Sequence, residues 1–173
     1  MALRTRLARL DDGEQLLAWR NHASSREQSL NTHIISLETH LAWLAATLAD
    51  PQALLLLAEY DSLPAGQLRL NREADQRYFL SWSIAPEHQG QGIGKTLLRA
   101  FCGATAMRLH ARIKPTNPAS QRIAEAAGFE LSATDSGWDT WQRNPISQQA
   151  AYTSDPQTIV DNINSQGAPL NFL

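Results

Sequence analysis

Apolar residues recur with two different periods in the first third of the chain, and these periods predict a strand followed by two helices. Residues 3–7 alternate between apolar or threonine side chains and arginines, which is typical of a strand with one buried face. Residues 11–19 predict a helix, because Asp11 and Glu14 form a capping-box sequence ahead of a helical pattern. Leucines at helical spacing over residues 37–48, after a capping serine, predict a second, amphipathic helix.

Further strands and helices are predicted downstream. An unbroken apolar run at residues 53–60 predicts a strand buried on both faces, which a turn at 62–66 joins to the next strand. A helix follows the glycines near residue 92, and another begins at Pro118, since Asn117 can cap it. The other predicted strands cover residues 67–70, 78–84, 109–114 and 137–142. Strands and helices mixed in this way predict an α/β or α+β fold around one sheet.

Length and charge narrow the class of protein. The chain has 173 residues, of which 43% are hydrophobic, and this suits one globular domain. A net charge of -2 and a pI of about 6.2 argue against nucleic acid or a membrane surface as the partner. The single cysteine, Cys102, can form no internal disulfide, and the N-terminus lacks an apolar signal core. We therefore expect a cytoplasmic protein without a metal site.

A glycine-rich segment at residues 89–94 lies between a predicted strand and a predicted helix. Glycines let a ligand approach the main chain closely, and the N–H groups at a helix start attract anions, so a phosphate-bearing ligand is expected here. The spacing fits neither a P-loop, which needs a glycine at position 89, nor a dinucleotide fingerprint, which needs one at position 95. The pattern Gln/Arg-x-x-Gly-x-Gly/Ala, by contrast, is met by Gln89, Gly92 and Gly94.

This pattern resembles the pyrophosphate-binding motif of the GNAT superfamily of acetyl-CoA-dependent N-acetyltransferases. Asn117-Pro118-Ala119-Ser120, followed by Gly-Phe at 128–129, is similar to the second CoA-contacting segment of that family. The resemblance spans roughly residues 3–143. It implies a GNAT-like domain over residues 1–145, with a mixed, mostly antiparallel central sheet, a splayed strand pair and flanking helices.

The resemblance also implies which residues hold acetyl-CoA as cosubstrate. The strand at 78–84 would offer main-chain groups to the pantetheine arm, with the amide of Ile84 facing the thioester and stabilising a developing oxyanion. The glycine-rich segment would cradle the pyrophosphate. The implied cofactor-binding residues are Ile84, Gln89, Gly90, Gln91, Gly92, Ile93, Gly94, Lys95, Asn117 and Ser120.

The acid and the base are absent from their usual family positions. Arg112 stands where many members place a glutamate that acts as base, and Ala124 stands where they place a tyrosine that protonates the leaving thiolate. Tyr78, His22, His33 and His110 remain as catalytic candidates, of which we select Tyr78 and His22. A water chain can replace a base, because an amine with a pKa of about 8 is already partly neutral at pH 7.

Early helices form one wall of the acceptor groove in this family. The resemblance therefore implies that Arg20 and Asn21 contact the acceptor, and Trp82 can stack on a ring. The surrounding sequence is similar to the branch that acetylates nucleotide-linked amino sugars, and the ribosomal-protein N-terminal acetyltransferases share a similar opening. Three hypotheses follow: transfer of acetyl to a small primary amine by direct attack in a ternary complex, with an amino sugar favoured; acetylation of protein N-termini; and acyl-CoA binding without catalysis.

The last part of the chain differs in charge from the rest. No Lys or Arg follows Arg143, yet residues 146–173 contain scattered apolar side chains, and Asp155-Pro156 can start a short helix. We expect this C-terminal extension to be ordered by docking on the domain or on a partner subunit, as in a homodimer.

Overall fold

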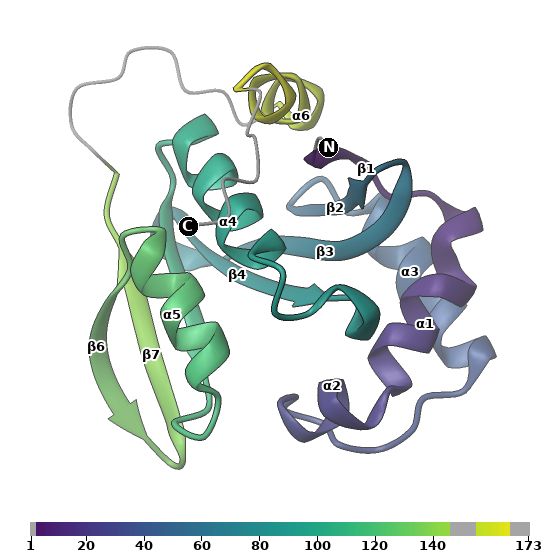
Figure 1. The fold of residues 1–173 in the computed structure, drawn as a ribbon, viewed down its shortest axis with the longest axis horizontal. Coiled ribbons are helices and arrows are strands. Elements are labelled where there is room, and N and C mark those ends of the chain that lie inside the picture. The colour runs from purple at the N-terminus through teal and green to yellow at the C-terminus, as the bar shows by residue number, and fades with distance from the viewer. Residues whose placement is uncertain (1–2, 146–154, 167–173) are drawn as a thin grey trace.

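A computed structural model describes residues 3–145 and 155–166, which build one mixed sheet with helices on both faces (Figure 1). The sheet has seven strands in the order β1-β2-β3-β4-β5-β7-β6. All neighbouring strands are antiparallel except β4 and β5, which confirms the predicted mixed, mostly antiparallel sheet. The strands are β1 (Leu3–Leu7), β2 (Ala53–Tyr60), β3 (Leu63–Arg72), β4 (Arg77–Ile84), β5 (Arg108–Ile113), β6 (Glu130–Asp135) and β7 (Trp138–Arg143).

Helices cover both faces of the sheet because successive residues of its central strands are apolar. Leu54 and Leu56 of β2 lie in the core that α4 covers, whereas Leu55 and Leu57 pack with α1 and α3. No helix among the described residues is long and apolar enough to cross a membrane. The helices are α1 (Gly13–Asn21), α2 (Ala23–Glu27), α3 (Leu37–Ala49), α4 (Ile93–Ala104), α5 (Pro118–Ala126) and α6 (Pro156–Ser165), with the 3-10 turns η1 (Leu10–Asp12), η2 (Ala74–Gln76) and η3 (Pro86–His88).

β4 and β5 form the splayed pair that the family resemblance implied. Pairing joins residues 77–79 of β4 to residues 108–110 of β5, and β4 then continues to Ile84 paired only with β3. The first turn of α4 lies where the strands separate. A Cβ built on Gly94 would lie 2.6 Å from Cδ1 of Ile123 and 3.3 Å from Cγ1 of Ile84. The start of α4 therefore packs tightly between the end of β4 and α5.

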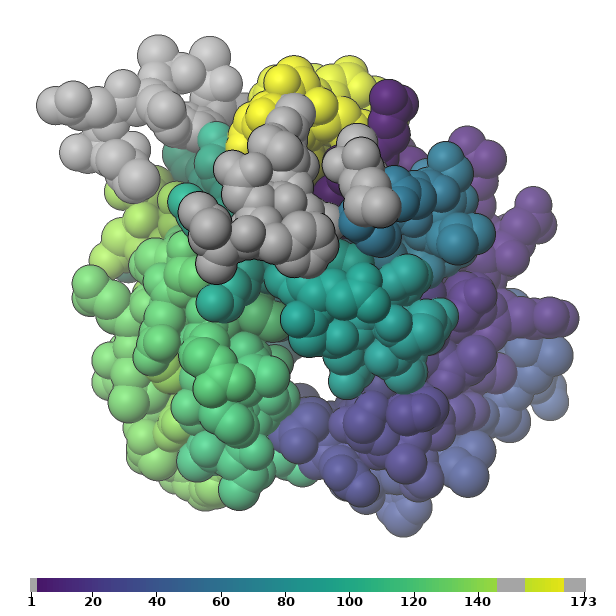
Figure 2. All heavy atoms as spheres, viewed as in Figure 1, coloured from purple at the N-terminus to yellow at the C-terminus, as the bar shows by residue number. Residues whose placement is uncertain are grey.

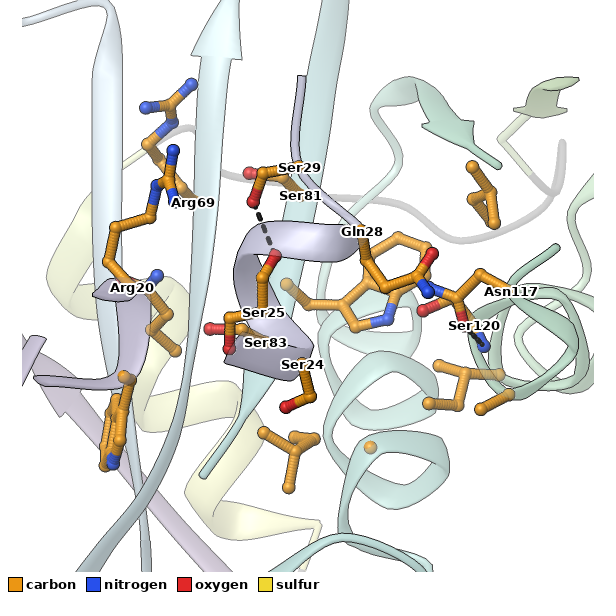
Figure 3. Close-up of a pocket in the computed structure, with 18 of the residues that line it drawn as sticks. Arg20, Ser24, Ser25, Gln28, Ser29, Arg69, Ser81, Ser83, Asn117 and Ser120 are labelled. Atoms are coloured by element: carbon orange, nitrogen blue, oxygen red, sulfur yellow. Dashed lines mark hydrogen bonds between the residues drawn. The ribbon is translucent and has the colours of Figure 1, made fainter. Parts of the chain in front are cut away.

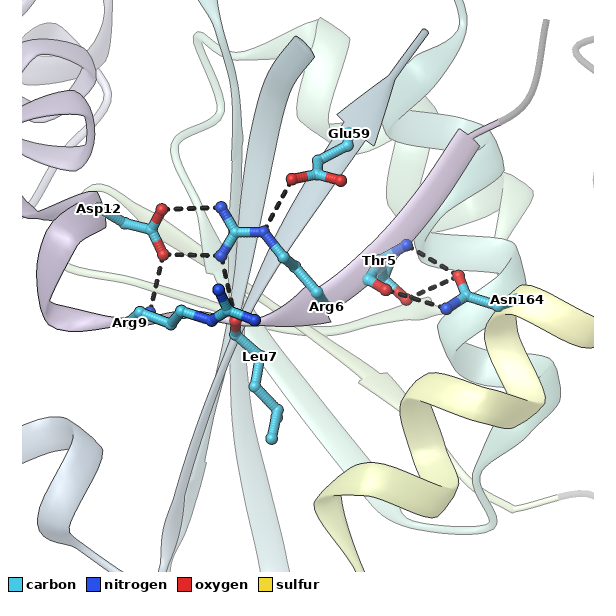
Figure 4. A network of polar contacts seen from close by, with 7 residues as sticks. All are labelled: Thr5, Arg6, Leu7, Arg9, Asp12, Glu59 and Asn164. Atoms are coloured by element: carbon cyan, nitrogen blue, oxygen red, sulfur yellow. Dashed lines mark hydrogen bonds and ion pairs between the residues drawn. The ribbon is translucent and has the colours of Figure 1, made fainter. Parts of the chain in front are cut away.

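The first helix starts differently from the prediction. α1 follows the η1 turn, and Asp12, rather than Asp11, makes the polar contacts at this end. The guanidinium of Arg6 lies 2.7 Å from the Asp12 carboxylate and 2.7 Å from the Glu59 carboxylate (Figure 4), and it holds the pKa of Asp12 below its ordinary value. The capping box predicted for Asp11 and Glu14 is wrong, because this network of ion pairs fixes the entry to the helix at Asp12.

Other elements also depart from the pattern-based expectation. The hairpin between β2 and β3 turns at Asp61-Ser62, both with positive φ, so residues 63–66, expected in the turn, belong to β3. The polar segment after α1 contains the short helix α2. β6 was not predicted, because all of its residues are exposed and no apolar alternation marks it.

α6 covers the open edge of the sheet at β1 (Figures 1 and 4). The N–H of Thr5 donates to Oδ1 of Asn164 at 2.8 Å, and Nδ2 of Asn164 donates to the carbonyl oxygen of Thr5 at 2.9 Å. The side-chain amide thus occupies the place that a neighbouring strand would take. An edge strand with satisfied main-chain groups is less prone to pair with another chain.

The apolar side of α6 enters the main core. Ile159, Val160 and Ile163 are buried in the cluster that includes α4, and the helix starts at Asp155-Pro156 as predicted. Residues 146–154 and 167–173 lie outside the described residues. The boundary at residue 145, docking on a partner subunit and a homodimer stay predictions.

Truncation of Ile159 tests how strongly α6 contributes to the stability of the domain. Its side chain is 0% exposed, so Ile159→Ala should lower the free energy of unfolding by about 2–5 kcal/mol. Ile34→Ala is the matched control, because Ile34 is 71% exposed, and it should change the free energy by less than about 0.5 kcal/mol. Denaturant unfolding measures both variants, and equal effects would contradict the packing of α6 on the core.

Candidate active site

The opening between β4 and β5 leads into a cleft of about 1000 Å³. Figure 2 shows the hollow between green α5, the teal segment at the start of α4 and the purple-blue segment around α2. The lining has two sides, which we call the α4 side (residues 89–95 and α5) and the α1 side (α1, α2, α3 and the face of β3 and β4 on which these helices pack). One continuous space therefore joins the glycine-rich segment to the early helices.

The end of β4 offers main-chain groups to this cleft. Ala85 donates its N–H to the carbonyl oxygen of Ala65 at 2.9 Å, on the β3 side. Because successive residues of a strand point their main-chain groups to opposite edges, the N–H of Ile84 points to the edge that β5 has left. The carbonyl oxygen of Ile84 accepts a hydrogen bond from Nε2 of Gln89 at 3.2 Å. Ile84 therefore has the orientation that a thioester-facing amide requires.

The glycine-rich segment presents bare main chain to the cleft. Gly90 and Gly92 both have φ +76, and a Cβ built at either position would meet no atom within 4 Å. Gly92 is the N-cap of α4, so the N–H groups of Ile93, Gly94 and Lys95 have no partner within the helix. Bare main chain, N–H groups at a helix start and a lysine suit the pyrophosphate of CoA.

The start of α5 faces the same space. Oδ1 of Asn117 accepts the N–H of Ser120 at 3.1 Å, so Asn117 is the N-cap that the sequence predicted, and both residues line the cleft. Gln91 is the one implied cofactor-binding residue outside the lining, and its side chain donates to the carbonyl oxygen of Glu87 at 3.1 Å. The structure brings the other implied residues together around the α4 side.

The α1 side carries a polar strip that the sequence analysis missed. Antiparallel partners point to the same face of a sheet, and the register of β3 and β4 pairs Gln67 with Ser83 and Arg69 with Ser81. These four residues, the polar strip, all line the cleft, and three of them are labelled in Figure 3. The available signal was a polar side chain at every second position of two neighbouring strands.

Aromatic and basic side chains complete the α1 side. The rings of His40 and Trp43 in α3 have centroids 5.2 Å apart, and the guanidinium carbon of Arg69 lies 5.6 Å from the centroid of the Trp43 ring. Arg20, in the last turn of α1, donates Nη2 to the carbonyl oxygen of Asn31. Burial lowers the pKa of His40 below its ordinary value, so the imidazole is neutral at neutral pH.

Both predicted catalytic residues lie outside the cleft. Tyr78 packs against the main core, and His22 is exposed at the junction of α1 and α2, where Nδ1 lies 2.8 Å from Oγ of Ser24. Neither residue belongs to the lining. Among the described residues, no group of three or more His, Cys, Asp or Glu could hold a metal ion.

The residues predicted to contact an acceptor separate into different environments. Arg20 lines the cleft, but Asn21 does not, because its amide bonds the main chain of Ile35 at 2.8 and 2.9 Å and holds the segment before α3. Trp82 lines the cleft with its ring 6.4 Å from that of Phe129. It stands on the opposite face of β4 from the polar strip, so an acceptor would meet it only where the opening joins the two sides.

The two positions where the sequence departs from the family pattern hold no carboxylate or phenol, and their environments differ. The guanidinium carbon of Arg112 lies 5.5 Å from the centroid of the Trp138 ring, and Nζ of Lys114 lies 5.3 Å from it. Lys114, directly after β5, also donates to the carbonyl oxygen of Glu27 in α2, and this contact crosses the cleft. Ala124 is fully buried.

The family comparison agrees with this fold and this cleft. A family model described as an acetyltransferase (GNAT) domain matches residues 3–130, and the chain therefore belongs to this family. It is an acetyl-CoA-dependent N-acetyltransferase. The superfamily resemblance drawn from the two CoA motifs is confirmed. Comparison with curated protein sequences gave no match.

Solved structures of N-acetyltransferases share the fold. The chain is similar to the aminoglycoside acetyltransferase AAC(6')-Ib in complex with coenzyme A, with a TM-score of 0.71, 20% identity and coverage of 83% of this chain and 95% of that one. The chain is also similar to spermidine N-acetyltransferase from Vibrio cholerae in complex with CoA and spermine, with a TM-score of 0.72, 16% identity and coverage of 82% of this chain and 93% of that one. For ribosomal-protein-alanine N-acetyltransferase from Brucella melitensis the TM-score is 0.67 and the identity 25%, with coverage of 81% of this chain and 98% of that one.

Filling the glycine-rich segment tests where CoA binds. Gly92→Trp should abolish acetyl-CoA binding in calorimetric titration, because an indole would occupy the bare main chain before α4. Gly137→Trp is the matched control: Gly137 has φ +80 and an equally open Cβ position, but it lies in the β6–β7 turn outside the cleft, so the strain is similar. Unchanged affinity in Gly92→Trp, or equal loss in both variants, would contradict the assignment.

Proposed function

We propose that this N-acetyltransferase transfers the acetyl group of acetyl-CoA to the primary amine of a small molecule, with an amino sugar as the favoured acceptor. The observation that carries the proposal is the continuous cleft. It has a strand end whose β5 edge is unpaired and a bare helix start on the α4 side, and a polar strip on the α1 side. Hydroxyl and amide groups of the strip suit the hydroxyls of a sugar.

The α4 side binds and orients the thioester. Acetyl-CoA, when bound, supplies an activated acetyl group. The N–H groups at the start of α4 and Lys95 would hold the pyrophosphate, and the unpaired end of β4 would align the pantetheine arm. The N–H of Ile84 would donate to the thioester oxygen as negative charge develops there, a contribution of about 3–4 kcal/mol in enzymes that use such a donor.

The α1 side would present the amine for direct attack in a ternary complex. The amine nitrogen bonds to the acetyl carbon, the carbon–sulfur bond breaks, and the thiolate of CoA leaves. The amine loses one proton and the thiolate gains one. Neither Tyr78 nor His22 lines the cleft, so neither would carry these protons directly. Water can carry them from an amine with a pKa of about 8.

Acetylation of protein N-termini is the second candidate. The 25% identity to the ribosomal-protein-alanine N-acetyltransferase supports it. A third candidate is an acyl-CoA-binding sensor, which Arg112 and Ala124 support because they replace the usual base and acid. The three candidates differ in product: an N-acetylated small amine, an N-acetylated peptide, or none.

Release of CoA distinguishes these candidates. Incubation with acetyl-CoA and panels of amino sugars, amino acids, polyamines and N-terminal peptides should give time-dependent CoA thiol and one class of acetylated product by mass spectrometry. The assay can use a thiol reagent, because the only cysteine, Cys102, is buried and burial raises its pKa to about 11. Tight acetyl-CoA binding without release on any panel would favour the sensor.

A further inference from the structure

We infer that the acceptor carries an anionic group, a carboxylate or a phosphate, and that Arg20 and Arg69 bind this group on the α1 side of the cleft. The inference rests on the proposed function, because it names the acceptor class of the same site. It is carried by three features of the lining: its charge, the positions of its cations and its unpaired polar atoms.

The cleft is strongly basic in a chain whose net charge is -2. Glu27 is the only acidic residue among the described residues that line it. The cationic residues of the lining are Arg20, Arg69, Lys95, Arg112, Lys114 and Arg122. A surface of low net charge thus concentrates positive potential at one place, which attracts anions to the cleft.

CoA accounts for only part of this charge. Lys95 stands in the first turn of α4 and Arg122 in the middle of α5, both on the α4 side of the cleft, and they suit the phosphates of the cofactor. Arg69 belongs to the polar strip, and Arg20 reaches the cleft from α1, so both lie across the sheet from α4 (Figure 3). A ligand that meets these two guanidiniums approaches from the acceptor side.

The two arginines are held in place without an acidic partner. No carboxylate among the described residues lies within 4.0 Å of either guanidinium. Nη1 of Arg20 and Nε of Arg69 are buried and have no hydrogen-bond partner in the protein. Asn31 fixes Arg20 from one side, and Trp43 stacks on Arg69. A partly buried guanidinium without a hydrogen-bond partner costs free energy. Such a group suits the oxygens of a carboxylate or phosphate, to which arginine can donate two parallel hydrogen bonds.

The same side also holds an acceptor for an amine. Oε1 of Gln67 is buried without a partner, two residues from Arg69 on the same face of β3. Hydroxyls of Ser81 and Ser83 lie opposite on β4. An ammonium or amine can donate to these oxygens while an anionic group contacts the arginines. The favoured acceptor is therefore a small molecule that bears both groups, such as an amino acid or a phosphorylated amino sugar.

This charge pattern opposes polycationic acceptors. The aminoglycoside acetyltransferase, with kanamycin bound in its structure, shares the fold at 20% identity. The spermidine N-acetyltransferase, with spermine bound in its structure, shares the fold at 16% identity. Arg20 and Arg69, which have no carboxylate partner among the described residues, would repel a polyamine from the α1 side of the cleft. Specificity would differ from these structural relatives although the fold is shared.

Matched acceptor pairs test the anion subsite. Glucosamine 6-phosphate is compared with glucosamine, O-phosphoethanolamine with ethanolamine, and β-alanine with propylamine, by CoA release and by calorimetric titration of the CoA-loaded protein. The anionic member of at least one pair should bind about 10- to 100-fold more tightly than its neutral partner. Spermidine and kanamycin should not be acetylated. A preference within the glucosamine 6-phosphate or O-phosphoethanolamine pair would identify the anionic group as a phosphate, and a preference within the β-alanine pair would identify it as a carboxylate.

Substitutions link the preference to the arginines. Arg69→Met and, independently, Arg20→Met should remove most of the preference, whereas Arg72→Met should retain it, because Arg72 lies on the same strand, exposed and outside the cleft. Equal binding within every pair, or a preference unchanged in both cleft variants, would overturn the inference. Arginine-dependent binding without CoA release would instead leave the anion subsite standing and contradict the proposed transfer.

Discussion

The early end of pairing between β4 and β5 is the constraint on which the rest of the structure depends. The two strands separate after Phe79, and the first turn of α4 packs where they part, against Ile84 and Ile123. An unpaired strand edge inside a protein needs partners for its N–H and C=O groups. Gln89 satisfies the carbonyl of Ile84, and a ligand can satisfy the N–H that points the same way. The early end of pairing thus creates the strand edge at which we propose that the ligand binds.

The two sides of the cleft use different physical means to recognise charge. On the α4 side, anion binding depends on main-chain N–H groups at the start of α4, which only glycines at positions 90 and 92 leave accessible. On the α1 side, we propose that it depends on the guanidiniums of Arg20 and Arg69, which Asn31 and Trp43 hold in place. Both means are local, which explains how a chain of net charge -2 can bind anionic ligands.

Local patterns predicted the elements and the cofactor motif but not the acceptor side. The glycine spacing and the Asn117 cap are short-range features, and both are placed as expected. The position of Arg69 beside Ser81 on the cleft face, by contrast, depends on the register between β3 and β4, and the sequence of one strand alone does not predict that register. Asn21 and Tyr78 lie outside the cleft for the same reason, because long-range packing gives Asn21 an amide contact to Ile35 and places Tyr78 against the core.

Amide hydrogen exchange of β4 with and without CoA tests the central claim most directly. The N–H groups of Trp82 and Ile84 should exchange rapidly in the free protein and become protected in saturating CoA, because they face the edge that β5 leaves. The N–H groups of Ser81 and Ser83, which point toward β3, should be protected in both states. Equal protection of all four in the free protein, or no change at Ile84 with CoA, would contradict the account.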